Sequence, residues 1–152
     1  MQSATPDRTK NIWLRYRLWW VGVLAIIASV AANLLVRQLA LATLGISDEF
    51  EELSGIGAII TITSLTTLGV LGAVIVFALL ERFARRPILM FKRIAVVALV
   101  LSFVPDVLLL VASVPGATVV SVGVLMSMHV VAWVISVGML ITLAGRGRVR
   151  GS

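Results

Sequence analysis

Several residue types that carry chemistry are scarce or missing in this sequence. The chain of 152 residues contains no cysteine, which excludes disulfides, thiolate metal sites and cysteine nucleophiles. It contains one histidine and one tyrosine, so few groups are available for proton transfer. Charged residues make up 13% of the chain, whereas a soluble domain has about 25%. These shortages predict a protein that is not an enzyme and that holds neither a metal ion nor a cofactor.

Apolar residues are abundant instead. They make up 60% of the chain, and the mean hydropathy is +1.09. A helix needs about 20 mostly apolar residues to cross the ~30 Å hydrocarbon layer of a membrane. The sequence therefore predicts an all-α membrane protein, an antiparallel up-down-up-down bundle of four transmembrane helices. The four predicted spans cover residues 18–44, 58–80, 94–114 and 118–143.

The predicted spans use up most of the chain. We expect a single transmembrane domain over residues 18–143, with a basic tail at 1–17 before it and a second basic tail at 144–152 after it. No room remains for a separate soluble domain.

Lysine and arginine gather on one side of the predicted spans. Of the 13 in the chain, four precede the first span, five lie between the second and third, and three follow the fourth. Loops rich in these residues stay on the cytoplasmic side, so we expect both tails in the cytoplasm and the acidic segment 45–57 outside. This distribution also accounts for the net charge of +6, so membrane lipids rather than nucleic acid are the expected partners.

Two local patterns bear on how the spans begin and pack. Pro87 disfavours helix at the residue before it, so the apolar residues 88–91 are expected in the membrane interface, ahead of the third span. Gly69 and Ala73 form a small-x-x-x-small pattern in the second span. Such a pattern allows the backbones of two helices to approach closely.

Four polar side chains interrupt the apolar spans. Insertion of an ionisable residue into the bilayer centre costs about 2.5 to 3.5 kcal/mol, so such residues usually face the bundle interior and find partners. At ~1.5 Å of rise per residue, all four lie between the membrane midplane and the outer interface. The candidate intramembrane cluster is Asn33, Arg37, Asp106 and His129.

Pro105 directly precedes the carboxylate in the third span. A proline inside a helix removes one backbone donor and leaves the carbonyl four residues earlier without its helical bond. That carbonyl belongs to Leu101, so we expect a helix kink at Pro105 beside Asp106.

The polar cluster has two interpretations. In the first, an Asp106–Arg37 ion pair, supported by Asn33 and His129, fixes how the helices pack. In the second, the same residues form a pocket, open to the outer side, for a proton, a cation or a small ligand. One His, one Asp and one Asn fall short of a usual metal shell. An Asp–His pair could act as a base, but the spans offer no evident nucleophile.

Short motifs along the chain resemble a known family. They are Trp19-Trp20, residues 31–35 (AANLL), residues 82–87 (RFARRP), Pro105 and Met128-His129. In this respect the chain is similar to an uncharacterised family of small bacterial four-span membrane proteins, a domain of unknown function. The resemblance implies a four-helix protein of the bacterial inner membrane and brings no activity with it.

Small multidrug exporters resemble the chain in outline only. Those proteins carry a functional glutamate in the first span, whereas Asn33 and Arg37 stand here without a carboxylate. We therefore expect a non-enzymatic accessory or structural membrane protein, with lipids, other membrane proteins or further copies of itself as partners. The alternatives are a small transporter or ligand-binding protein that uses the polar cluster, and a membrane enzyme acting on a lipid-soluble substrate.

Overall fold

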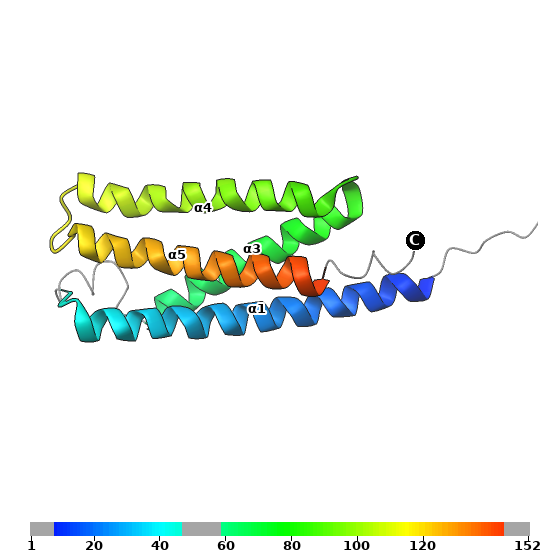
Figure 1. Ribbon diagram of the computed structural model, residues 1–152, viewed down its shortest axis with the longest axis horizontal. Helices are drawn as coiled ribbons and strands as arrows, with labels where there is room; N and C mark the ends of the chain where they lie inside the picture. Colours follow the sequence, from blue (N-terminus) through cyan, green and yellow to red (C-terminus); the bar gives the residue numbers. More distant parts are fainter. Residues whose placement is uncertain (1–7, 47–58, 145–152) are drawn as a thin grey trace, which may run out of the picture.

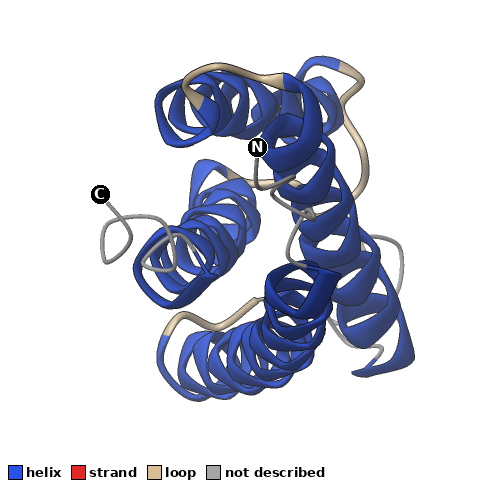
Figure 2. Ribbon diagram, turned by 90° about the vertical axis from the view of Figure 1, so that its right-hand side faces the viewer, coloured by secondary structure: helices blue, strands red, loops and turns tan. Residues whose placement is uncertain are grey.

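Four long helices make up the protein, and the prediction of an all-α fold is confirmed. The computed structural model describes residues 8–46 and 59–144, so the acidic residues 48–52 and most of the C-terminal tail lie outside the described part. No strand occurs among the described residues, as Figure 2 also shows. The helices are α1 (Arg8–Thr43), α3 (Ile59–Phe83), α4 (Pro87–Val111) and α5 (Val119–Met139), and a π-helical turn, η1 (Leu140–Ala144), continues α5.

Each helix contains a segment that is long and apolar enough to cross a membrane. The segment in the first helix is Arg17–Thr43, and the last one runs through α5 and η1 as Val119–Leu143. Large apolar side chains cover the outside of the bundle, for example Leu35, Leu68 and Val100, which are 58 to 68% exposed. Apolar side chains in this number on the surface suit a protein whose solvent is lipid rather than water.

The helices pack in a fixed order of neighbours. Helix α5 lies in the middle, with α4 on one side and α1 on the other (Figure 1). Helix α3 crosses behind them obliquely, near α1 at its first residues and near α4 at its last residues. In Figure 1, α1 and α4 have their later residues on the left, and α3 and α5 have theirs on the right. Helix α3 therefore diverges from α4 with distance from the short 84–86 connection.

Two apolar clusters fill the ends of the bundle. One contains Phe77 of α3 and Phe91 of α4, whose rings meet edge to face with centroids 5.0 Å apart. The other contains Ala40, Ile62 and Val122. Along α1, α3 and α5, the polar residues Asn33, Thr66 and His129 fall between the two clusters, so the polar layer lies near the middle of the bundle.

The third helix begins earlier than predicted. Proline suits the first position of a helix, because the N–H that it lacks would have no partner there. Helix α4 accordingly starts at Pro87 and not at residue 94. Residues 88–91 therefore belong to α4, and Phe91 is 1% exposed in the bundle core; their position in the membrane interface stays a prediction.

The turn between α4 and α5 has positive φ at Ser113 and Gly116. Thr118 then caps α5, since its Oγ1 accepts a hydrogen bond of 3.1 Å from the backbone N–H of Ser121. Residue types that favour turns and helix starts thus set this boundary.

Helix α1 packs through one face of small and polar residues. Gly22, Ala25, Ser29 and Asn33 are all buried, at positions that recur every three or four residues. A Cβ added to Gly22 would lie only 3.2 Å from a methyl group of Val74 on α3. The close approach of α1 and α3 at this point therefore leaves little room for a larger residue.

Candidate functional site

A cavity of about 410 Å³ lies between α3, α4 and α5. Small residues form much of its wall. They lie along the part of the bundle where α3 diverges from α4. A Cβ added to Gly69 or Gly72 would meet no atom within 4 Å. The small residues that line the cavity are Gly69, Gly72 and Ala73 of α3, Ala95 and Ala98 of α4, and Ala132 of α5.

The small-x-x-x-small pattern thus has a different role from the one predicted. Gly69 and Ala73 were expected to bring two helix backbones together. In the structure both residues border open space, and the close approach is made instead at Gly22 of α1. The sequence pattern correctly indicated small side chains at Gly69 and Ala73. It did not indicate that a cavity, and not another helix, would lie beside them.

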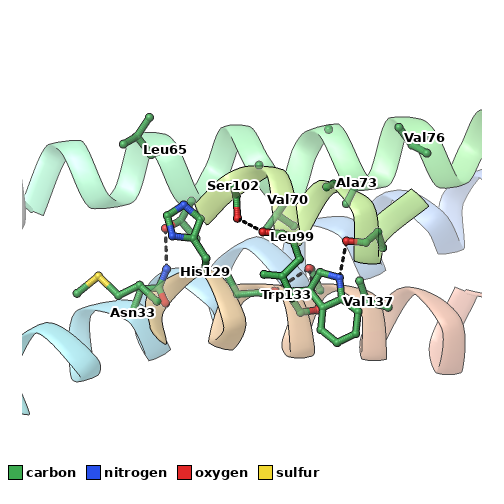
Figure 3. Close-up of a pocket in the computed structure, with 18 of the residues that line it drawn as sticks. Asn33, Leu65, Val70, Ala73, Val76, Leu99, Ser102, His129, Trp133 and Val137 are labelled. Atoms are coloured by element: carbon green, nitrogen blue, oxygen red, sulfur yellow. Dashed lines mark hydrogen bonds between the residues drawn. The ribbon is translucent and has the colours of Figure 1, made fainter. Parts of the chain in front are cut away.

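The cavity is apolar over most of its length and polar at one end. Figure 3 shows Val76 and Val137 toward one end and Asn33 and His129 at the other. Ser102 of α4 lies near the polar end in the same view. The polar end coincides with the polar layer between the two apolar clusters.

Asn33 is the one residue of α1 that lines the cavity among the described residues. It is 3% exposed, and its Nδ2 donates a hydrogen bond of 3.0 Å to Thr66 Oγ1 on α3. Its Oδ1 is buried without a hydrogen-bond partner. Buried polar atoms are nearly always bonded, so an unpartnered acceptor at a cavity wall marks a place where a ligand or water completes the structure.

Asp106 and His129 meet between α4 and α5. His129 Nδ1 lies 3.3 Å from Asp106 Oδ2 and 2.9 Å from the carbonyl oxygen of Leu125. The Phe103 ring stands edge to face with the imidazole, with centroids 6.4 Å apart. Asp106 is buried and is not among the described residues that line the cavity, whereas His129 lines it. The imidazole therefore separates the carboxylate from the cavity.

The structure places His129 beside Asp106, where the sequence predicted Arg37. Helices α1 and α4 lie on opposite sides of α5, so a residue of α5 reaches the carboxylate first (Figure 1). Arg37 is half-buried, one helical turn beyond Asn33, and is absent from the described cavity lining. The structure thus brings Asn33 and His129 to the cavity, places Asp106 behind His129, and leaves Arg37 outside this group.

Helix α4 continues through Pro105 to Val111. The kink that we predicted at Pro105 stays a prediction. The hydroxyl of Ser102 bonds the Leu99 carbonyl at 2.7 Å, within its own helix.

Sequence reasoning missed one residue of the site. Trp133 of α5 lines the cavity, and its Nε1 donates a hydrogen bond of 2.8 Å to the carbonyl oxygen of Ala95 on α4. The signal was available, because a tryptophan in the middle of an apolar span must place its N–H on a partner. Which partner it uses depends on the neighbouring helix, which the sequence does not reveal.

The described residues contain no group of three or more His, Asp or Glu side chains that could hold a metal ion. The chemistry available at the cavity is therefore apolar contact along its length and hydrogen bonding at its polar end.

No curated protein and no solved structure matches the chain. One protein family does, over residues 14–148, a range that contains all four apolar segments and every cavity residue. This match confirms the resemblance to a family without known activity, and the structure adds the four helices. The chain belongs to the family of unknown function designated DUF6069.

Proposed function

We propose that this protein is an integral membrane protein that binds a lipid-soluble molecule in the cavity between α3, α4 and α5. The molecule has an apolar body and one polar end. The observation that carries the proposal is the cavity itself, which is apolar along its length and polar at Asn33 and His129. Of the three roles considered from the sequence, ligand binding thus has more support than a purely structural role.

The size of the cavity supports a small molecule rather than a protein segment. Sites for small ligands occupy about 300 to 1,000 Å³, and this cavity has about 410 Å³. An α-helix ~10 Å across fills on the order of 120 Å³ per residue, so the cavity would hold only about one turn of a partner helix. A single chain or a small ring system fits better.

The surroundings of the cavity support entry from the bilayer. Gly69 of α3 and Ala98 of α4 both line the cavity and are both exposed. The cavity is therefore open between these two helices, where the outer surface of the bundle is apolar. A molecule dissolved in the lipid could move into it without crossing water.

The distribution of basic residues supports an orientation. In a cell membrane, the basic tails lie on the cytoplasmic side. Because the helices alternate in direction, the turn between α4 and α5 then lies on the outer side. Within the apolar segment Val119–Leu143, His129 is nearer to that turn than to the C-terminal end of the segment. The polar end of the cavity then lies toward the outer leaflet and the apolar end toward the inner leaflet.

An enzymatic role has less support. Ser102 and Ser136, the two serines of the cavity wall, donate their hydroxyl hydrogens to carbonyls of their own helices. Both bonds stay within the serine's own helix, so neither serine hydroxyl is activated by the Asp106–His129 pair.

The structural role remains the second candidate because specific contacts favour it. The Asn33–Thr66 bond joins α1 to α3, and the Trp133–Ala95 bond joins α5 to α4. Interhelical hydrogen bonds of this kind stabilise membrane bundles. A protein with these contacts and an empty cavity would serve as a scaffold or as an accessory subunit.

Filling the cavity separates the two roles. The purified full chain is examined by native mass spectrometry for a bound lipid-soluble molecule carried over from the membrane. We expect such a molecule on the wild type and an occupancy about tenfold lower in Gly72→Leu, whose side chain takes the same space. Gly138→Leu is the matched control, since Gly138 also has free space around its Cβ position but lies outside the cavity lining. An adduct unaffected by Gly72→Leu, or no adduct on the wild type, contradicts ligand binding here.

A further inference from the structure

Several polar hydrogens at the cavity wall are already used within the protein. Ser102 and Ser136 each donate to a carbonyl of their own helix at 2.7 Å. Trp133 Nε1 donates to the Ala95 carbonyl at 2.8 Å. The Asn33 amide donates through Nδ2 to Thr66. The two serine hydroxyls and the indole N–H therefore have no hydrogen left for a ligand, whereas the lone pairs of the serine oxygens and of Asn33 Oδ1 remain available.

Asn33 supplies an acceptor that is both buried and unpaired. The side chain is 3% exposed, lines the cavity, and holds an Oδ1 atom without a hydrogen-bond partner. The bond to Thr66 holds the amide in place through Nδ2, and Oδ1 is the atom left without a partner. A buried unpaired acceptor is unfavourable, and a donor in the cavity removes that penalty.

His129 supplies a second acceptor. Its Nδ1 lies 2.9 Å from the Leu125 carbonyl, and a carbonyl only accepts, so Nδ1 carries the hydrogen. The Asp106 carboxylate at 3.3 Å from the same nitrogen favours the same tautomer. In the neutral ring Nε2 is then an acceptor. The imidazole is 38% exposed, and it lines the cavity.

We infer that the ligand of this cavity is a lipid-soluble alcohol or phenol, whose single hydroxyl group donates to Asn33 Oδ1 or His129 Nε2. This inference rests on the proposed function and adds the chemistry of the polar end. The apolar remainder of the molecule lies along the small and aliphatic residues of α3, α4 and α5.

Other polar ends fit this wall less well. A carboxylate or phosphate would face the unpaired Asn33 oxygen, with the Asp106 carboxylate behind His129. A ketone or an ether would present a further acceptor and leave the Asn33 oxygen unpaired. An ammonium group can donate, but it would leave its water for a mostly apolar cavity that has no carboxylate in its described lining.

The test compares amphiphiles that share one apolar chain. The full-length protein in lipid nanodiscs is photolabelled with a diazirine-bearing dodecanol, and unlabelled compounds compete for the labelled cavity peptides. The competitors are dodecanol, its isomer undecyl methyl ether, dodecanoic acid and dodecylamine. We expect dodecanol to compete at a mole fraction about tenfold lower than the ether, because the two differ only in the donated hydrogen.

Variants locate the hydrogen bond. Asn33→Leu and His129→Phe each remove one acceptor, and each should reduce the preference for the alcohol over the ether while the ether still competes. His129→Phe leaves the Asn33–Thr66 bond intact, so the test survives if Asn33→Leu fails to fold. Ser127→Ala is the control, since Ser127 donates to its own helix as Ser102 does, at 2.7 Å, but lies outside the cavity lining.

The outcomes separate this inference from the proposed function. Equal competition by alcohol and ether, or strongest competition by the acid or the amine, overturns the inference of a hydroxyl donor and leaves a ligand-binding cavity. A preference that survives both Asn33→Leu and His129→Phe also overturns it. Absence of labelling at the cavity peptides overturns the proposed function itself.

Discussion

His129 on α5 stands between the Asp106 carboxylate on α4 and the cavity. Its Nδ1 lies 3.3 Å from Asp106 Oδ2, and the ring lines the cavity wall. The carboxylate therefore acts on a ligand only through the imidazole, whose tautomer and orientation it helps to set. This arrangement makes Asp106 a positioning residue for His129.

Substitution of the carboxylate tests this relationship. We expect Asp106→Asn to lower the melting temperature in detergent, with a loss of about 1 to 2 kcal/mol in the free energy of unfolding. The physical reason is that an amide lacks the negative charge with which the carboxylate attracts the Nδ1–H group of His129 at 3.3 Å. In a protein that already carries His129→Gln, Asp106→Asn should lower the free energy of unfolding by less. Equal losses in the two backgrounds would show that the two side chains do not stabilise each other.

The Asn33–Thr66 bond should be measurable as a coupling energy between α1 and α3. Interhelical bonds in membranes contribute on average about 0.6 kcal/mol, so we expect a coupling of about 1 kcal/mol or less in the cycle of Asn33→Leu and Thr66→Val. Thermal melts of the four proteins in one detergent provide the measurement. Thr67→Val, at a half-buried neighbour of Thr66 outside the cavity lining, is the control and should show no coupling to Asn33. Strictly additive losses would argue against the bond.

Two glycines should respond in opposite ways to the same substitution. Alanine in a helix interior is about 0.5 to 1 kcal/mol more favourable than glycine, so Gly69→Ala should raise the melting temperature, since its Cβ meets nothing within 4 Å. Gly22→Ala should lower it or leave it unchanged, because the new methyl lies 3.2 Å from Val74. If both variants were stabilised equally, the close contact of α1 and α3 at Gly22 would be excluded.

The proposed orientation has a direct test. A reporter fused after Ser152 should read as cytoplasmic, and one inserted at residues 115–116 should read as external, because the basic residues lie beside the two tails and the 84–86 connection. A matched insertion at residues 84–85 provides a second cytoplasmic reading. An external signal from the C-terminal fusion would reverse the orientation and, with it, the leaflet that holds the polar end of the cavity.

Local pattern was sufficient to predict the helices and part of their packing. The lengths of the apolar runs predict four spans, and the buried residues Gly22, Ala25, Ser29 and Asn33 follow one another at intervals of three or four, the spacing of one helix face. Both the run lengths and this spacing depend only on the order of residues within a single helix. Pro87 has two effects here: Arg86 before it is not helical, as predicted, and α4 begins at Pro87 itself, earlier than the predicted start of the span at residue 94.

The sequence by itself determined the four apolar helices, the face that α1 buries and the polar residues that must lie inside the bundle, because each depends on helical periodicity and on the cost of polar groups in an apolar medium. Only the tertiary structure decided that Asp106 meets His129 and not Arg37, that Trp133 bonds Ala95, and that Gly69 and Gly72 border a cavity. These outcomes depend on which helices are neighbours and on the oblique path of α3. Packing between helices sets both, and the pattern along a single helix does not contain that information.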